Sequence, residues 1–129
     1  MKTNLKAKLD KVFSLYIRAR DSAPYQGKYF KCISCGKILP ISQADCGHYI
    51  NRRHMATRFS EINCHAQCRS CNRFDEGNIM EYRKTLVQMY GEEQVLLLEA
   101  SKNNLNPISD TEYKLSIKYY QQQIKKLQL

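Results

Sequence analysis

Two C-x-x-C pairs constrain this chain more than any other feature of its sequence. They are Cys32/Cys35 and Cys68/Cys71. Two thiolates separated by two residues on a tight turn both reach one ion at about 2.3 Å, and a second such turn completes a tetrahedron. Gly36, directly after Cys35, permits the first turn. We therefore expect these four cysteines to bind one structural zinc ion.

Other interpretations of the cysteines are weaker. A thioredoxin-like redox pair is disfavoured, because there are two pairs and no βαβ pattern surrounds them. The 32 residues between Cys35 and Cys68 exceed what a plain zinc ribbon needs, so a folded segment must lie between the pairs. Cys46 and Cys64 remain, and we expect both to be small buried apolar residues.

Charge is distributed unevenly along the 129 residues. The net charge is +9, and residues 27–73 carry eight Lys and Arg against two acids, whereas residues 74–129 carry seven against eight. This asymmetry favours a polyanionic partner such as nucleic acid. A basic surface without a specific partner is the alternative. Because no stretch of about 18 apolar residues and no apolar secretory run is present, we expect a cytoplasmic protein with no membrane contact.

The apolar spacing predicts an α+β fold, in which helices surround a small β core. Residues 1–26 contain a helix over residues 4–20 with helically spaced apolar residues. Short strands are expected at residues 29–31 and 44–50, the second with Gly47 at a bulge or close approach, and a loop at residues 51–63. Helical patterns follow Cys71, with an interruption at Gly77 and an end at Gly91.

A last helix is predicted to begin at the capping box formed by Ser109 and Glu112. Its apolar residues recur in steps of four and three: Tyr113, Ile117, Tyr120, Ile124 and Leu127. Such a stripe packs on the rest of the domain, against the first helix for example, or forms the seam of a homodimer. Both alternatives are open at this point.

The polar residues between and beside the cysteine pairs carry a specific resemblance. His48 lies on a predicted strand, Asn63 on the following loop, and Asn72 directly after the second pair. This order resembles HNH, or His-Me finger, endonucleases, in which a second C-x-x-C directly precedes the third residue. The implied fold is a zinc-stapled ββα-metal core wrapped by N- and C-terminal helices.

Further motifs narrow the resemblance to the NinG/Rap family of phage recombination endonucleases, which act on branched DNA. The matching segments lie between Tyr16 and Leu86: YIRARD at 16–21, CISCG at 32–36, D-x-GHY at 45–49, RF-x-E-x-N at 58–63, H-x-QC at 65–68, CNR at 71–73 and GNI-x-EYRK at 77–84. This resemblance implies an N-terminal helix packing on the core at 1–26, a nuclease core at 27–90 and a C-terminal helical extension at 91–129. It also implies a phage or prophage protein acting on DNA in a bacterial cytoplasm.

The resemblance assigns catalytic roles residue by residue. His48 would deprotonate the attacking water, Asn63 would orient the imidazole or its loop, and Asn72 would offer an oxygen to a catalytic Mg²⁺ or Mn²⁺ ion. Many relatives carry another metal ligand immediately before the base, where this chain has Gly47. Asp45 is our substitute, and Glu76 is a second candidate.

Several basic residues surround this motif. We expect contacts to the DNA backbone from five arginines: Arg52, Arg53, Arg58, Arg69 and Arg73. His54 receives no catalytic role. His65 either supports the site, through a phosphate contact for example, or makes a structural hydrogen bond.

Three functions are consistent with these features. The first is a metal-dependent endonuclease that hydrolyses branched or recombination-intermediate DNA. The second is a non-catalytic zinc module that binds nucleic acid or bridges proteins in a recombination complex, but such a module does not need His48, Asn63 and Asn72. The third is a restriction- or homing-type HNH nuclease, for which the chain lacks an evident base-reading element.

Overall fold

The structure is a computed structural model that describes residues 3–105 and 107–128. Its main elements, in chain order, are α1 (Thr3–Ser22), β1 (Tyr29–Lys31), β2 (Ile38–Pro40), β3 (Ala44–His48), α2 (Met55–Arg58), β4 (Cys64–Cys68), α3 (Ile79–Tyr90), α4 (Glu92–Ala100) and α5 (Asp110–Leu127). A π-helical turn covers Ser70–Phe74. This arrangement confirms a mixed α+β fold.

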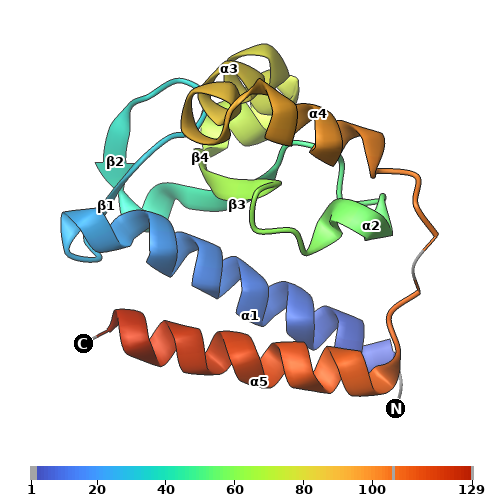
Figure 1. Ribbon diagram of the computed structural model, residues 1–129. Helices are drawn as coiled ribbons and strands as arrows, with labels where there is room; N and C mark the ends of the chain where they lie inside the picture. Colours follow the sequence, from blue (N-terminus) through green and yellow to red (C-terminus); the bar gives the residue numbers. More distant parts are fainter. Residues whose placement is uncertain (1–2, 106, 129) are drawn as a thin grey trace.

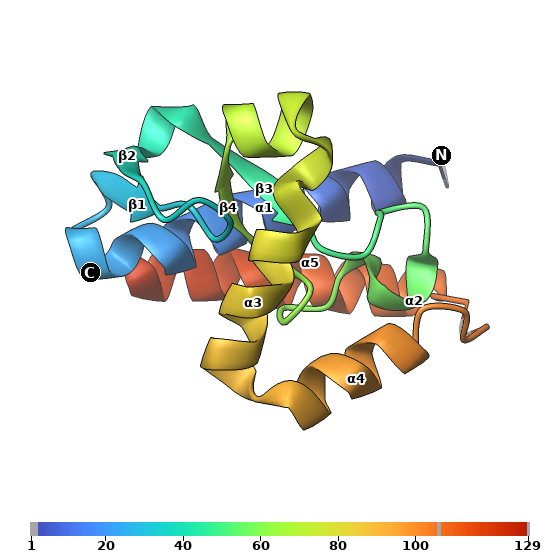
Figure 2. The ribbon, with the colours of Figure 1, turned by 90° about the horizontal axis from the view of Figure 1, so that it is seen from above.

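Helices α1 and α5 form one layer, in which they lie side by side and run in the same direction (Figures 1 and 2). Leu9, Phe13 and Ile17 of α1 are fully buried and share a cluster with Tyr120 of α5. The Phe13 and Tyr120 rings meet edge to face with centroids 5.1 Å apart. The predicted capping box is confirmed, because Glu112 N donates to Ser109 Oγ and Ser109 N donates to the Glu112 carboxylate. The apolar stripe of α5 therefore packs on the first helix, while a homodimer stays a prediction.

Two antiparallel hairpins form the β part of the molecule. Strand β1 pairs with β2, and β3 pairs with β4. Gly47 lies in regular register opposite His65, so the bulge that we considered there is wrong. The close approach is confirmed, because a Cβ at residue 47 would lie 2.0 Å from Oε1 of Gln67. A side chain at this position would therefore displace Gln67.

Helices α3 (Ile79–Tyr90) and α4 (Glu92–Ala100) lie on the side of β3 and β4 opposite to α1 and α5, and they cover the second face of that hairpin (Figure 1). Gly77, at φ 80°, interrupts the helical pattern as predicted, and Gly91 ends α3. Tyr82 and Leu86 of α3 pack with Val95 of α4 and Ile33 of the first cysteine turn. The segment 51–63, predicted as loop, contains the short helix α2.

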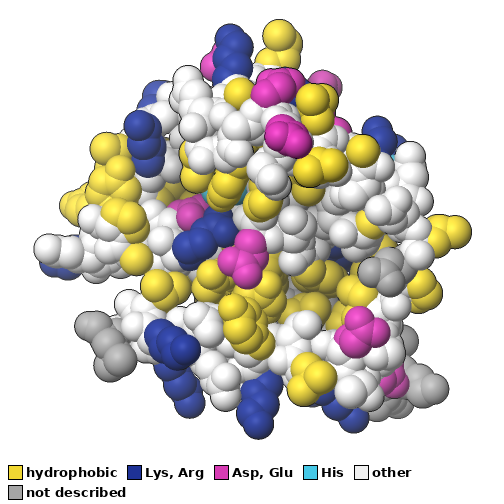
Figure 3. All heavy atoms as spheres, viewed as in Figure 1, with side chains coloured by type: hydrophobic (Ala, Val, Ile, Leu, Met, Phe, Trp, Pro, Cys, Tyr) yellow, Lys and Arg dark blue, Asp and Glu magenta, His cyan; other side chains and the backbone are white. Residues whose placement is uncertain are grey.

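Residues 74–129 carry seven Lys and Arg against eight acids, a near balance that does not predict where these charges lie on the surface. On the face drawn in Figure 3, Lys and Arg side chains line the lower edge over α5, while acidic side chains gather over α3 and α4. Among the described residues, no helix is both long and apolar enough to cross a membrane.

Candidate functional site

The four paired cysteines meet in one cluster. The Sγ atoms of Cys32, Cys35, Cys68 and Cys71 all lie within 4.8 Å of one another. The first pair lies on the turn between β1 and β2, whereas Cys68 ends β4 and Cys71 lies in the π-helical turn. Because two separate hairpins and a helical turn supply the sulfurs, an ion bound here would hold all three together. The cluster therefore could hold a structural metal, as the spacing predicts.

Nearby N–H groups complete this cluster. Cys68 N donates to Cys32 Sγ at 3.3 Å, and Cys71 N donates to Cys68 Sγ at 3.4 Å. The Asn78 side-chain amide donates to Cys71 Sγ, also at 3.4 Å. Donors around the sulfurs stabilise thiolates and orient them toward an ion. A set of four sulfurs favours Zn²⁺ over Mg²⁺ or Mn²⁺.

His48 is the last residue of β3 and is partly buried. Its Nε2 lies 3.1 Å from the carbonyl oxygen of Arg58. Since a carbonyl only accepts, Nε2 carries the proton and Nδ1 keeps the free lone pair. Burial lowers the pKa of His48, and the charges of Arg52 and Arg58 act in the same direction, against the Arg58 carbonyl. The ring is therefore held neutral and in one tautomer.

Asn63 fastens the loop that supplies this carbonyl. Its side chain is fully buried. Oδ1 accepts from Ile50 N at 2.8 Å, and Nδ2 donates to Ile50 O at 3.1 Å and to Thr57 O at 3.2 Å. The amide thereby connects the residue two positions after His48 to the residue immediately before Arg58. These side-chain hydrogen bonds do not include the imidazole, so the effect of Asn63 on His48 passes through the loop.

Asp45 and Asn72 lie next to each other, 27 residues apart in sequence. Asn72 Nδ2 donates to Asp45 Oδ2 at 3.0 Å. Arg73 donates to both carboxylate oxygens, each at 2.9 Å, and Arg69 Nε lies 4.0 Å from Oδ1. The side chain of Asp45 is only 15% exposed, whereas both guanidiniums are half exposed. Two oxygen-bearing side chains and two arginines thus meet at one place on the surface.

His48 and Asp45 leave opposite faces of β3, because they are three residues apart on a regular strand. Along the strand they are separated by about 10 Å. Among the described residues, no hydrogen bond or ion pair joins Asp45 or Asn72 to His48, and none joins Glu76 to Asp45 or Asn72. The structure therefore brings together the pair Asp45 and Asn72, and separately His48 with the loop held by Asn63.

The predicted DNA contacts divide into two groups. Arg52, Arg53, Arg69 and Arg73 are exposed. The Arg58 side chain is only 9% exposed, and its guanidinium binds both oxygens of Asp10, through Nε at 2.9 Å and Nη2 at 2.5 Å, and the Arg52 carbonyl. This geometry favours an internal role for Arg58 over the phosphate contact that we expected. His54 is the capping residue directly before α2, and its Nε2 accepts from Arg53 Nε at 3.4 Å.

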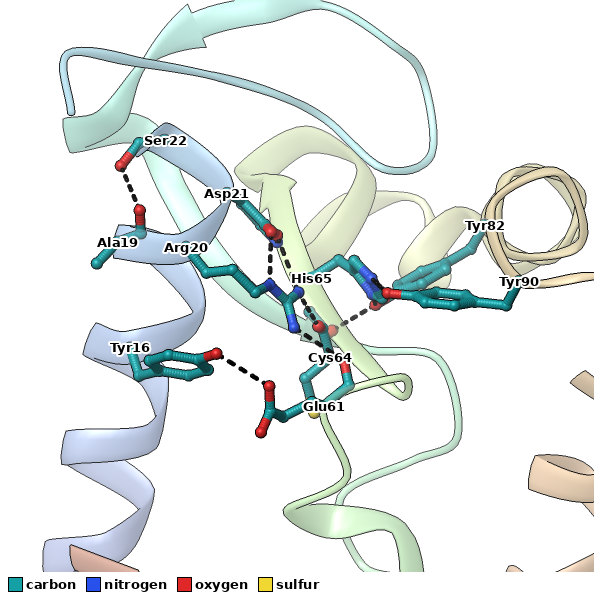
Figure 4. Close-up of polar contacts among 12 residues, drawn as sticks. Tyr16, Ala19, Arg20, Asp21, Ser22, Glu61, Cys64, His65, Tyr82 and Tyr90 are labelled. Carbon is teal, nitrogen blue, oxygen red and sulfur yellow. Dashed lines mark hydrogen bonds and ion pairs between the residues drawn. The ribbon is translucent and has the colours of Figure 1, made fainter. Parts of the chain in front are cut away.

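His65 makes structural hydrogen bonds under α3. Its Nε2 lies 2.9 Å from the Tyr90 hydroxyl, and Nδ1 lies 3.4 Å from the Tyr82 hydroxyl (Figure 4). The side chain is 2% exposed, and burial lowers its pKa to about 4. A buried neutral imidazole cannot contact a phosphate, so the structural alternative is the one this geometry favours.

An ion pair on α1 positions β4 and is not evident from the sequence. Arg20 donates to the Glu61 and Cys64 carbonyls at 3.0 and 2.8 Å, and Asp21 accepts from Ala66 N at 2.7 Å (Figure 4). The two residues also pair with each other at 2.8 Å. The YIRARD segment at 16–21, noted above only as a motif, therefore supplies the end of α1 that holds the edge of β4.

A second group of soft ligands was also missed. Cys46 and Cys64 have a ring nitrogen of His48 beside them, and all three ligand atoms lie within 4.8 Å of one another. The expected burial holds for Cys64, which is 0% exposed, but Cys46 is only partly buried. A signal was present in the i, i+2 spacing of Cys46 and His48 on a predicted strand, which places both on one face.

Comparison with known proteins identifies the family. The family model described as "Bacteriophage Lambda NinG protein" matches residues 1–129. Protein ninG of Escherichia phage lambda is 37% identical over 113 residues, 87% of this chain and 52% of the relative. Protein ninG of Escherichia phage 933W is 38% identical over 89 residues, 68% of this chain and 41% of the relative. Protein ninG of Salmonella phage P22 is 35% identical over 113 residues, with coverages of 87% and 52%.

This chain spans about half the length of these relatives. No solved structure matches it. The family model covers the whole sequence, including the cysteine pairs and the polar residues between them. The chain therefore belongs to the NinG family of phage proteins.

Proposed function

We propose that this chain is a metal-dependent DNA endonuclease of the HNH, or His-Me finger, type, which hydrolyses phosphodiester bonds in branched or recombination-intermediate DNA. The observation that carries the proposal is the state of His48: a neutral imidazole whose Nε2–H is bound to the Arg58 carbonyl, so that Nδ1 keeps its lone pair. A general base needs this combination of fixed orientation and free lone pair.

In this proposal His48 Nδ1 takes the proton from the attacking water. The Nε2–H bond to the Arg58 carbonyl then stabilises the imidazolium that forms, because its donor strengthens as the ring becomes charged. Asn63 is a positioning residue, since it holds the loop from which that carbonyl projects. General-base catalysis of this kind contributes about 10²- to 10⁴-fold to the rate.

Asp45 and Asn72 fit a hard divalent cation. Their side chains supply carboxylate and amide oxygens at adjacent positions, and such ligands suit Mg²⁺ or Mn²⁺. A bound ion would neutralise charge that develops on the leaving 3′ oxygen. Asn72 would present Oδ1 to the ion, whereas it now donates through Nδ2 to Asp45. Glu76 is disfavoured because, among the described residues, it makes no hydrogen bond or ion pair with either of them.

Arginines beside this pair are suited to bind the DNA backbone. Arg73 and Arg69 lie next to Asp45 and are half exposed, so a phosphate can exchange with the carboxylate as their partner. Arg52 and Arg53 lie in the loop after His48. We assign recognition to DNA shape and backbone, with branched DNA as the substrate class that the family resemblance implies.

Because His48 and Asp45 lie on opposite faces of β3, the substrate can bind productively in only a limited range of positions. A scissile phosphate must lie beside β3, where groups from both faces of the strand reach it. The same separation favours the second candidate function, a non-catalytic metal-stapled module that binds nucleic acid. The two candidates share the cysteine cluster, for which we propose zinc, and the basic surface.

Cleavage of a four-way junction tests the proposal. With Mg²⁺ or Mn²⁺ present, the protein should nick the junction, and EDTA should stop the reaction. Asp45→Asn and Asn72→Ala should cut at least tenfold more slowly, while a mobility-shift assay shows that the junction is still bound. Asp75→Asn, an exposed acid in the same segment, is the matched control and should cut normally. Binding without any metal-dependent cleavage would instead support the non-catalytic module.

A further inference from the structure

We infer that Cys46, His48 and Cys64 form a second, soft-metal site of this chain, separate from the cluster of four cysteines. The donor set is two sulfurs and one imidazole nitrogen, and its ligand class is a thiophilic ion such as Zn²⁺, Co²⁺ or Cd²⁺. Hard ions such as Mg²⁺ are poor matches for these ligands.

The hairpin places the three side chains on one face. Cys46 and His48 are two residues apart on β3, and His48 lies opposite Cys64 on β4. Residues two apart on a strand share a face, and directly opposed residues of an antiparallel pair do as well. The ligand atoms all lie within 4.8 Å of one another. In a tetrahedral site with bonds of about 2.0–2.3 Å, ligand atoms are about 3.5–3.7 Å apart. Side-chain rotations that bring the ligand atoms closer by no more than about 1 Å would therefore let all three bind one ion.

A fourth donor lies beside two of these ligands. The carbonyl oxygen of Arg58 is 3.1 Å from His48 Nε2 and 3.5 Å from Cys64 Sγ. Both groups now donate a proton to this single oxygen. An ion bound by Nε2 and the Cys64 sulfur would release the thiol proton to solvent, and the ring proton would then be carried by Nδ1. The Arg58 carbonyl or a water would be the remaining ligand.

Access and surroundings also suit an ion. Cys64 is fully buried at the back of the group, whereas Cys46 and His48 are partly exposed, so an ion can enter from their side. If Cys46 and Cys64 were only small apolar residues of the core, nothing would require His48 on the same face of the hairpin. The hairpin is fixed independently of any ion, because Arg20 and Asp21 hold β4 through the Cys64 carbonyl and Ala66 N.

Occupation of this site would inhibit the nuclease, a consequence that rests on the proposed function. An imidazole that binds a thiophilic ion is removed from its hydrogen bond to Arg58 and from its role as base. The chain would then respond oppositely to two ions: Mg²⁺ or Mn²⁺ at Asp45 and Asn72 supports cleavage, and excess Zn²⁺ at Cys46, His48 and Cys64 stops it.

Cobalt titration tests the site without any activity measurement. The reduced full chain is first loaded with one equivalent of Zn²⁺, and Co²⁺ is then added under anaerobic conditions. We expect one further equivalent to bind with thiolate-to-cobalt absorption in the near ultraviolet. Cys46→Ser should abolish this second equivalent while circular dichroism and the bound zinc stay unchanged. The matched control is Ser42→Ala, on the same segment, which should bind cobalt like the wild type.

A total of one metal ion per wild-type chain, or a second equivalent that survives Cys46→Ser, would overturn the inference. Cleavage gives a separate readout. A tenfold excess of Zn²⁺ should slow junction cleavage by the wild type more than tenfold and slow Cys46→Ser far less. If the second equivalent binds but cleavage does not respond, the metal site stands and the role of His48 as base fails.

Discussion

Asn63→Ala tests the loop that we hold responsible for the state of His48. The Asn63 side chain is fully buried and makes three hydrogen bonds: one from Ile50 N, one to Ile50 O and one to Thr57 O. Alanine removes all three and leaves a buried amide and two carbonyls without these partners. Each lost bond costs about 1 kcal/mol net. We therefore expect unfolding to become easier by about 3 kcal/mol.

Thermal denaturation followed by circular dichroism measures this cost. For a domain of this size, 3 kcal/mol corresponds to a decrease in melting temperature of about 10 °C. Asn51→Ala is the matched control, because Asn51 is exposed in the same loop and its side chain accepts only from Arg53 N. It should change stability by less than about 0.5 kcal/mol. A loss below about 1 kcal/mol for Asn63→Ala would refute the reasoning that this amide holds the loop.

Three further predictions concern metal, pH and salt. A strong zinc chelator should unfold the core, and so should Cys68→Ser, because structural zinc contributes on the order of 10 kcal/mol in small modules. A cooperative thermal melt that neither treatment changes would contradict a structural metal site. The Arg83 guanidinium binds the Glu99 carboxylate and lowers the pKa of Glu99. The contact therefore stabilises the fold fully above the ordinary carboxyl pKa of about 4.3. This stabilisation is lost as the pH falls through the lower pKa of the folded state. Glu99→Gln should therefore lower the melting temperature more at pH 7 than at pH 3, and an equal effect at both values would exclude the ion pair as the cause. DNA affinity should fall steeply between 50 and 200 mM salt as counterions are released, about tenfold per decade of salt for each phosphate contact, and a salt-independent dissociation constant would argue against phosphate contacts.

The cysteine cluster and the long helices could be predicted from the sequence, because their signals are local. The C-x-x-C spacing requires adjacent sulfurs, and the capping box at Ser109 and Glu112 marks the start of α5 without reference to any other segment. The sequence left two alternatives for the apolar stripe of α5: packing on the domain or the seam of a homodimer. The stripe packs on α1, as the contacts of Tyr120 with Phe13 and Tyr16 show, and no local sequence signal indicates these contacts.

Strand β4 was not predicted, although its sequence CHAQC alternates apolar and polar residues. Five residues are a short signal, and the alternation does not separate a buried face from an exposed one here, because every residue of the strand is buried. His65 and Gln67 are polar but hydrogen-bonded inside, to Tyr90 and to the Gly77 carbonyl respectively. Their polarity therefore does not indicate which face meets water.

The candidate site was predicted as a set of residues but not as an arrangement. The position of Asp45 and Asn72 beside each other depends on β3 meeting the π-helical turn, and the internal role of Arg58 depends on Asp10, 48 residues earlier in the chain. Pairing across such distances follows from the fold and leaves no local signal. The shared face of Cys46 and His48 was visible in their spacing, but Cys64 joins them only through the register of β3 and β4.

The most direct test of the account compares single-turnover junction cleavage by His48→Ala and His54→Ala at saturating Mn²⁺. His54 lies in the same loop region but contacts Arg53 rather than the Arg58 carbonyl. We predict a loss of at least a hundredfold for His48→Ala, with junction affinity retained, and nearly normal cleavage by His54→Ala. Equal rates for His48→Ala and the wild type would contradict it and leave a metal-stapled DNA-binding module as the function of this chain.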